Sequence, residues 1–288
     1  MTTSRLLPAA LLLAVASQPA VGQVREPFPV PFTVEQHAVD GSLGGTPIAG
    51  EMIRETYGGS FLVSERADGG RTIVDFARRE MTEVRPKEGT YWSLSFGRFA
   101  ELRRRLEEAE AIETAPKQKA LGSKDRPSVR VEEVRDSSGP AVLGALGATE
   151  RTGKHLRASV EAGPSLDVWI DVSAPRLTPE GIAALADFER SVLGTTDGSV
   201  GPADLLETVR SREGGALAVR TRRTVGRDST SADVGPFLET VVTKAAPIAS
   251  LSATLVAVPQ GLRRVPSPLE VVVSWAEDEA AIRKGGRR

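Results

Sequence analysis

The chain has 288 residues and a formal net charge of −1, so no strong positive field draws it to nucleic acid or to an anionic membrane. It contains no cysteine, which excludes disulfides, thiolate metal sites and a lipid anchor on an N-terminal cysteine. The length is sufficient for one large domain or two small ones with a real core.

The N-terminal segment has the pattern of a secretory signal peptide, expected over residues 1–22. Arg5 supplies a positive charge, residues 6–16 form a short apolar run, and Ala20 and Gly22 place small residues before a cut. This run is shorter than the about 20 residues that a membrane-spanning helix needs. We therefore expect a periplasmic or secreted protein with no transmembrane anchor.

Segments rich in proline, glycine or charge set the expected limits of the folded domain. Residues 23–47 are rich in proline and glycine and are expected to form a flexible N-terminal lead-in. Residues 48–275 are expected to form a single domain. The charged segment 276–288 is expected to fray as a C-terminal tail.

Short extended segments follow the lead-in, joined by tight turns such as Asp68-Gly69-Gly70. Alternating residues predict β-strands, and the short turns predict that neighbouring strands pair as an antiparallel meander. The strands are expected at residues 50–57, 60–65, 71–76, 80–84 and 90–95.

The sequence period then changes to that of a helix. Apolar residues recur at three- and four-residue steps from Phe99 to Ile112, which predicts an amphipathic helix over 97–113. A second amphipathic helix is predicted over 178–193, with a threonine as its N-cap, and a helical turn over 203–210.

Further strands predict a second meander around these helices. They are expected at residues 128–135, 153–162, 165–172, 216–225, 237–244, 252–256 and 268–275. Because helices and strands do not alternate as in parallel βαβ units, the fold class is expected to be α+β.

The sequence holds few groups for catalysis. His37 and His155 lack a short metal-ligand spacing, and each is expected to be solvated or to lie at a strand rim. Neither a G-x-S-x-G nucleophile elbow nor a G-x-x-x-x-G-K-[ST] phosphate loop is present. The basic clusters 103–105 and 220–223 lack interleaved aromatic residues. We therefore expect no catalytic residue, no metal, no cofactor and no nucleic-acid partner.

Tyr91, Trp92 and Phe96 form the densest aromatic group. Trp92 and Leu94 share one face of their strand, because side chains alternate along a strand. This group belongs either to the core or to the wall of an apolar ligand site.

Short motifs over residues 48–265 suggest a family. They are Arg71-Thr72-Ile73-Val74-Asp75, Glu88-Gly89-Thr90-Tyr91-Trp92, Gly153-Lys154, Asp167-Val168-Trp169-Ile170 and Val258-Pro259-Gln260-Gly261-Leu262. In this order they resemble a family of exported bacterial proteins of unknown function that is related to the periplasmic lipoprotein carriers (LolA-like). The resemblance implies an antiparallel sheet curled into an incomplete barrel, with amphipathic helices covering a concave face that holds apolar groups.

Three functional hypotheses follow. The first is an exported, non-enzymatic protein that binds or carries an apolar ligand such as a lipid or lipoprotein acyl chain. Its expected ligand-binding residues are Ile73, Trp92, Leu94, Phe99, Leu102 and Trp169. The second is a structural or protein-interaction module of the bacterial envelope, with a fully packed core, no ligand and an envelope protein as partner. The third is a hydrolase with an unrecognised site.

Overall fold

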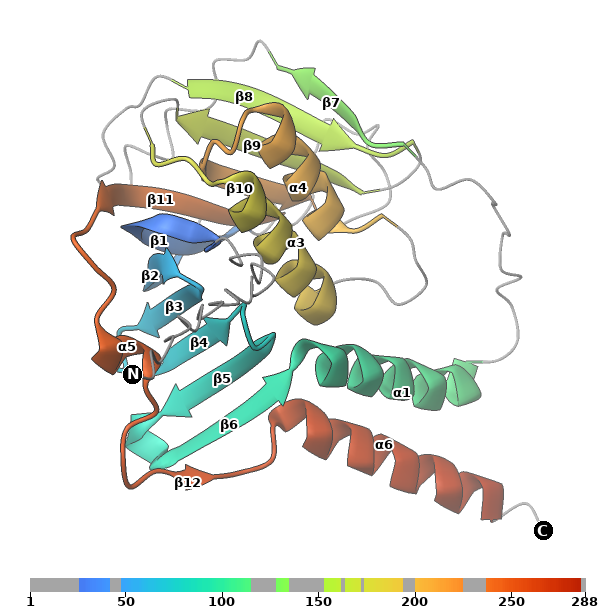
Figure 1. Cartoon of the computed structure of the whole chain (residues 1–288). Helices are drawn as coiled ribbons and strands as arrows, with labels where there is room; N and C mark the ends of the chain where they lie inside the picture. The colour runs from blue at the N-terminus through green and yellow to red at the C-terminus, as the bar shows by residue number, and fades with distance from the viewer. Residues whose placement is uncertain are drawn as a thin grey trace, which may run out of the picture.

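The structure is a computed structural model that describes residues 26–41, 48–114, 128–134, 153–161, 164–171, 174–193, 200–224 and 237–285. These residues form an open, curled and mostly antiparallel sheet with helices packed on it (Figure 1). The strand order is β12-β6-β5-β4-β3-β2-β1-β11-β10-β9-β8-β7. The expected α+β class and curled antiparallel sheet are therefore confirmed. The expected signal peptide lies outside the described residues.

The first predicted meander is confirmed strand by strand. Each strand pairs antiparallel with the next one along the chain, from β2 to β6. The strands and the short 3-10 turn before the last of them are β2 (Ile48–Gly59), β3 (Phe61–Arg66), β4 (Arg71–Asp75), β5 (Glu80–Arg85), η1 (Pro86–Glu88) and β6 (Thr90–Ser95).

A central strand replaces part of the expected flexible lead-in over 23–47. This strand, β1 (Phe28–Gly41), pairs with β2 on one side and with β11 (Phe237–Pro247) on the other. The lead-in prediction is therefore wrong for β1. Its prolines are compatible with a strand because the β1–β2 register jumps from Phe28 to Phe32, and two of them fall in that gap.

The second meander continues the same sheet from β11. Its strands also pair antiparallel with their neighbours. They are β7 (Arg130–Glu133), β8 (Gly153–Ser159), β9 (Ser165–Asp171) and β10 (Ala218–Thr224). The two expected meanders thus form one sheet, and the pairing of β1 with β11 joins them.

The predicted helices are confirmed as α1 (Phe96–Thr114), α3 (Pro179–Leu193) and α4 (Pro202–Arg212). α3 and α4 lie against one face of the sheet, and α1 extends outward from the end of β6 (Figure 1). No helix in the described part of the chain is both long and apolar enough to cross a bilayer.

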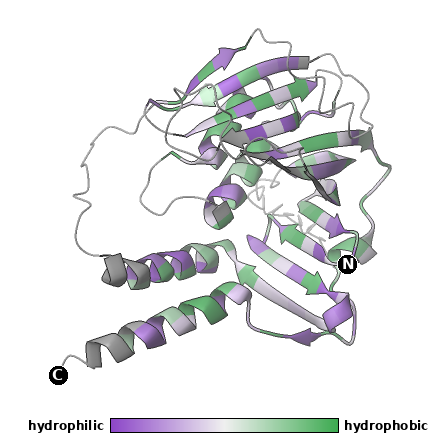
Figure 2. Cartoon of the chain, turned by 180° about the vertical axis from the view of Figure 1, so that it is seen from behind, coloured by the Kyte–Doolittle hydropathy of each residue, from purple (hydrophilic) through white to green (hydrophobic). Residues whose placement is uncertain are grey.

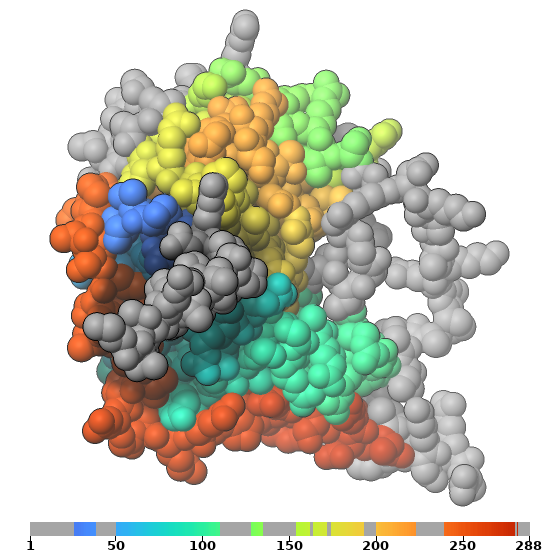
Figure 3. All heavy atoms as spheres, in the orientation of Figure 1, coloured from blue at the N-terminus to red at the C-terminus, as the bar shows by residue number. Residues whose placement is uncertain are grey.

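The C-terminal segment differs from the prediction. The strands expected at 252–256 and 268–275 are wrong, because these residues form α5 (Ala253–Val256) and the first half of α6 (Pro268–Gly285). α6 also includes most of the tail that was expected to fray over 276–288. It packs along α1 (Figure 3).

The short strand β12 (Arg263–Arg264) joins α5 to α6 and completes this part of the fold. It pairs parallel with β6 at the edge of the sheet.

The sheet has two apolar faces, and hydrophilic and hydrophobic residues alternate along its strands (Figure 2). The face covered by α1 and α3, called the inner face here, presents Leu62, Val74, Met81, Trp92 and Leu94 from β3 to β6. The opposite, outer face presents Val63, Ile73 and Val84, which pack under residues 255–262. In the second half of the sheet, α4 packs on the apolar side chains of β8 and β9.

Candidate functional site

Four of the six expected site residues meet on the inner face. Trp92 and Leu94 extend from β6, while Phe99 and Leu102 extend from α1, and all four belong to one buried cluster. The rings of Trp92 and Phe99 meet edge to face, with centroids 5.9 Å apart. They come together because α1 begins immediately after β6, so the strand face continues into the apolar stripe of the helix.

Ile73 lies on the outer face and cannot share a site with Trp92. The register places Ile73 opposite Val63 and Thr82, whereas its neighbour Val74 joins the inner cluster. Ile73 and Val74 are both β-branched, so the sequence pattern did not show which of them faces inward.

Trp169 occupies a separate position in the second half of the sheet. It contacts the rim of the inner cluster, and its ring stacks on His155 at 4.2 Å between centroids. The Arg220 guanidinium lies 4.4 Å from the same ring, and His155 Nε2 lies 3.1 Å from the Asp167 carboxylate. His155 is therefore packed into the sheet by a ring and a hydrogen-bond partner. No cluster of three metal-ligating side chains occurs among the described residues.

A row of aromatic rings crosses the inner face from β1 to α3 and the start of α1. Adjacent rings lie 4.6–6.3 Å apart, and most pairs meet at steep angles, which is favourable for aromatic contacts. The ring order is Phe32, Tyr57, Phe28, Phe76, Phe188 and Phe96. This row was missed because two of its members lie in the segment expected to be a flexible lead-in. Their even spacing in sequence was the available signal of a strand face.

The Trp92 side chain carries a polar group that the fold leaves unpaired. Its indole Nε1 is buried, with 5% of the residue exposed, and no described residue accepts its hydrogen bond. Leaving a buried donor unpaired costs about 1–3 kcal/mol, and buried tryptophans usually have a partner. The inner face therefore holds an N–H group that is available to an acceptor from outside the described chain.

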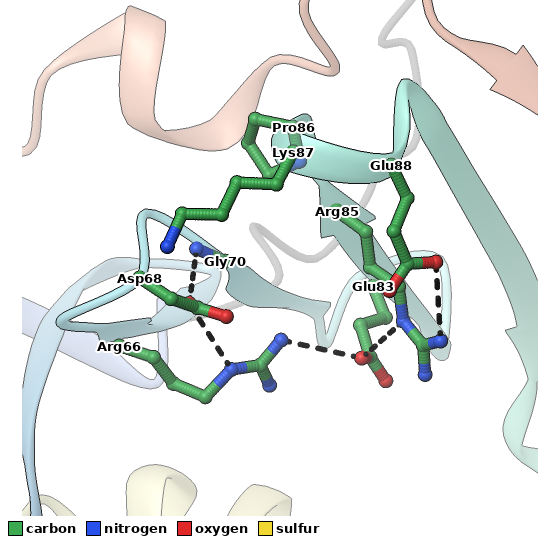
Figure 4. A pocket seen from close by; sticks show the side chains of 8 residues that line it. All are labelled: Arg66, Asp68, Gly70, Glu83, Arg85, Pro86, Lys87 and Glu88. Carbon is green, nitrogen blue, oxygen red and sulfur yellow. Dashed lines mark hydrogen bonds and ion pairs between the residues drawn. The ribbon is translucent and has the colours of Figure 1, made fainter.

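A charged pocket of about 280 Å³ lies near the end of the sheet that carries η1, and Glu83 of β5 is one of its lining residues (Figure 4). Glu83 lies directly opposite Trp92 in the β5–β6 register, so the two side chains share a face. The pocket lies between the β3–β4 turn and η1. Its charged residues are Arg66, Asp68, Glu83, Arg85, Lys87 and Glu88.

None of the residues that line this pocket was among the expected site residues. They come mainly from two turns that the sequence pattern does predict. In a meander, alternate turns lie at the same end of the sheet, so the β3–β4 and β5–β6 turns were predictable neighbours. The face of each side chain depends on the exact strand limits, which the sequence pattern does not settle.

A second polar group lies where α3 and α4 meet the middle of the sheet. Tyr57 donates a hydrogen bond of 2.6 Å to Glu55, and Arg210 donates bonds of 2.9 and 3.1 Å to Glu189. The loss of surrounding water raises the pKa of Glu55, although Tyr57, Arg210 and Gln36 oppose this effect. Burial also raises the pKa of Glu189 despite its pairing with Arg210.

The raised pKa of Glu55 predicts a pH-dependent contribution to stability. The folded state holds this proton more tightly than the unfolded state, so the contribution is complete below the ordinary carboxyl pKa of 4.5 and is lost as the pH rises through the folded value. Glu55→Gln keeps an acceptor for Tyr57 without a titrating group. We expect the variant to be more stable than the wild type at pH 7 and this advantage to shrink at pH 4, as measured by the free energy of urea unfolding. If the stability difference between the variant and the wild type were the same at both pH values, the raised pKa of Glu55 would be contradicted.

Neither a protein-family model nor a curated protein sequence matches the chain. Among solved structures, an uncharacterized conserved protein from Thermus thermophilus aligns at 9% identity and TM-score 0.38 over 83% of this chain and 91% of that one. PNGF-II aligns at 9% identity and TM-score 0.36, covering 86% of this chain and 33% of its own. A LolA superfamily protein from Nitrosomonas europaea aligns at 10% identity and TM-score 0.29, covering 81% and 92% of the two chains.

The solved structures thus include a LolA superfamily protein. At these identities and TM-scores the likeness is distant, and it assigns neither a family nor a function to this chain.

Proposed function

We propose that this protein binds or carries an apolar ligand, such as a lipid or an acyl chain, on the inner face of its sheet and catalyses no reaction on it. The observation that carries the proposal is the buried Trp92 Nε1 without an acceptor among the described residues, on an apolar face and opposite Glu83 of the charged pocket in the strand register. A ligand that has a polar end, a hydrogen-bond acceptor next to it and a hydrocarbon chain would match the charged pocket, the Trp92 N–H group and the apolar face in that order.

The energetics favour such a ligand. Each methylene group that leaves water contributes about 0.8 kcal/mol, so a fatty-acid chain offsets the costs of ordering and of lost translational freedom. A hydrogen bond from Trp92 to the ligand would also remove the cost of a buried unpaired donor. The pattern of residues 1–22 supports action outside the cytoplasm, in the periplasm or after secretion.

We expect saturable binding when the purified protein is titrated with a fluorescent lysolipid. Trp92→Phe retains an aromatic ring but removes the N–H group, so it should weaken binding by about three- to tenfold. Leu94→Ala should weaken binding further, because it shortens the apolar wall beside Trp92.

The matched control for Leu94→Ala is Val63→Ala. Val63 is fully buried but lies on the outer face, so its truncation should lower stability without changing lysolipid affinity. Thermal unfolding of every variant separates loss of fold from loss of binding. Absence of saturable binding to the wild type, or equal losses in the two alanine variants, would overturn the proposal.

The alternative, an interaction module of the bacterial envelope, has one feature in its favour. Val272 and Trp275 lie one turn apart on α6 and are 43% and 68% exposed. Exposed apolar residues of this kind often mark protein contacts. If lysolipid does not bind, and Trp275→Ser abolishes co-purification of a specific envelope protein, this alternative is the better one.

A further inference from the structure

We propose that the charged pocket between the β3–β4 turn and η1 binds a phosphate group, so that the ligand of the inner face is a phosphate-bearing amphiphile. The inference deepens the proposed function and rests on it for the apolar part of the ligand. The pocket itself stands on geometry that is independent of the apolar face.

The carboxylates of the pocket are already occupied by its arginines. Glu83 accepts bonds from Arg66 Nη2 at 3.3 Å and from Arg85 Nε at 2.9 Å. Glu88 lies 3.5 Å from Arg85, and Asp68 lies 3.7 Å from Arg66 (Figure 4). These contacts hold both guanidinium groups in place, and each group retains N–H donors that can point to a ligand.

Lys87 is the third cation of the pocket and brings the formal charge of its six charged side chains to zero. The Lys87 side chain extends over the pocket toward the β3–β4 turn, and its ammonium group forms no ion pair among the described residues (Figure 4). The hydrogen bond from the Gly70 N–H group lowers the pKa of Asp68 most, and the positive charges of Arg66 and Lys87 lower it further. Both cations therefore lie near the β3–β4 turn. The three cations and three carboxylates of the pocket sum to zero, and the donors that remain for an oxyanion are the Lys87 ammonium group and the remaining N–H groups of the two arginines.

Gly70 keeps the pocket open. A Cβ atom at this position would lie 2.5 Å from Arg66 Nη2 and 2.8 Å from Asp68 Oδ1. Both atoms belong to movable side chains, so an alanine would displace the guanidinium group from the pocket rather than unfold the sheet. Gly70→Ala is thus a variant that changes the shape of the pocket but not its charge.

The size and position of the pocket fit a headgroup. Its volume of about 280 Å³ is close to the lower limit of about 300 Å³ that is usual for whole small-molecule sites. A phosphate with a glycerol-sized group would fill it, whereas an acyl chain would have to continue past Trp92 onto the inner face. The polar and apolar ends of one amphiphile would then occupy adjoining regions of the same sheet face.

The test compares two lipids that share one acyl chain, lysophosphatidate and monoacylglycerol, in calorimetric titrations of the full chain. Glycerol 3-phosphate and inorganic phosphate are titrated separately as sources of phosphate without a chain. We expect lysophosphatidate to bind roughly tenfold more tightly than monoacylglycerol. Lys87→Gln and Gly70→Ala should abolish this difference, while Arg78→Gln, which removes an exposed charge at the β4–β5 turn, should preserve it.

Each outcome separates the two proposals. Equal binding of both lipids, unchanged in Lys87→Gln, would overturn the phosphate pocket and leave the apolar site intact. Binding of glycerol 3-phosphate or phosphate without either lipid would support the pocket and overturn the lipid function. Absence of binding by all four ligands would overturn both. Thermal unfolding of each variant verifies that the sheet remains folded.

Discussion

Replacing Glu239 with glutamine is expected to lower the free energy of unfolding by about 3–5 kcal/mol. Glu239 on β11 is fully buried and pairs with Arg220, which is 1% exposed, and with Arg222 Nε at 2.9 Å. The loss of its negative charge would remove a carboxylate partner that Arg220 and Arg222 of β10 share. The cost is large because the Arg220 guanidinium cannot regain water while the sheet is folded.

Urea unfolding measures this effect, and Glu35→Gln is the matched control. Glu35 pairs with Arg54 at 2.9 Å, but that arginine is half exposed, so its loss should cost less than about 1 kcal/mol. The double replacement Arg220→Met with Glu239→Leu should recover much of the lost stability, since it removes both buried charges. Similar losses in Glu239→Gln and Glu35→Gln would show that the pair is not buried in solution.

Leu102→Ala should be the most damaging of three alanine substitutions along α1, at Leu102, Leu106 and Arg104, with a cost of about 2–5 kcal/mol. Leu102 is 1% exposed and packs between α1 and the inner face, whereas Leu106 is half-buried at the rim of the same cluster. We therefore expect a smaller loss for Leu106→Ala. Arg104→Ala should hardly change stability, because Arg104 forms an exposed pair with Glu108. Equal shifts in melting temperature for all three would mean that the buried face of α1 is misassigned.

Local patterns were sufficient for most elements but not for their long-range partners. The alternation along β2 to β6 and the helical period of α1, α3 and α4 reflect faces that are buried, so they are visible in the sequence. β1 was missed because one of its two strand partners, β11, lies about 200 residues away. Its prolines suggested a loop, because a strand accommodates them only at a gap in the pairing register, and that gap is defined only by the folded sheet.

α6 shows a different kind of error, because a local signal was present. Three consecutive valines favoured a strand. Ser267 and Glu270 form a reciprocal capping box, with bonds of 2.8 and 3.2 Å, and Pro268 occupies the first turn. This S-x-x-E pattern starts the helix, and burial of Val273 against the inner cluster compensates for the weak helix propensity of valine.

The candidate site was predictable only where neighbouring elements build it. Trp92, Leu94, Phe99 and Leu102 are close in sequence, so a strand followed by a helix brings them together. Trp169 is separated from them because the sheet is long and open rather than closed. Lys87 and Gly70 line the same pocket only because two turns lie side by side in the folded sheet, and neither residue belongs to a distinctive sequence motif.

The pairing of β1 with β11 has a consequence for the newly made chain. At typical synthesis rates of about 5–20 residues per second, the partner of β1 emerges on the order of 10–40 s after β1 itself. During that interval β2 to β6 can assemble by local contacts, but one side of β1 presents unpaired backbone groups along a hydrophobic strand. Such an edge invites intermolecular pairing. Nascent molecules should therefore depend on chaperones until residue 247 has been added.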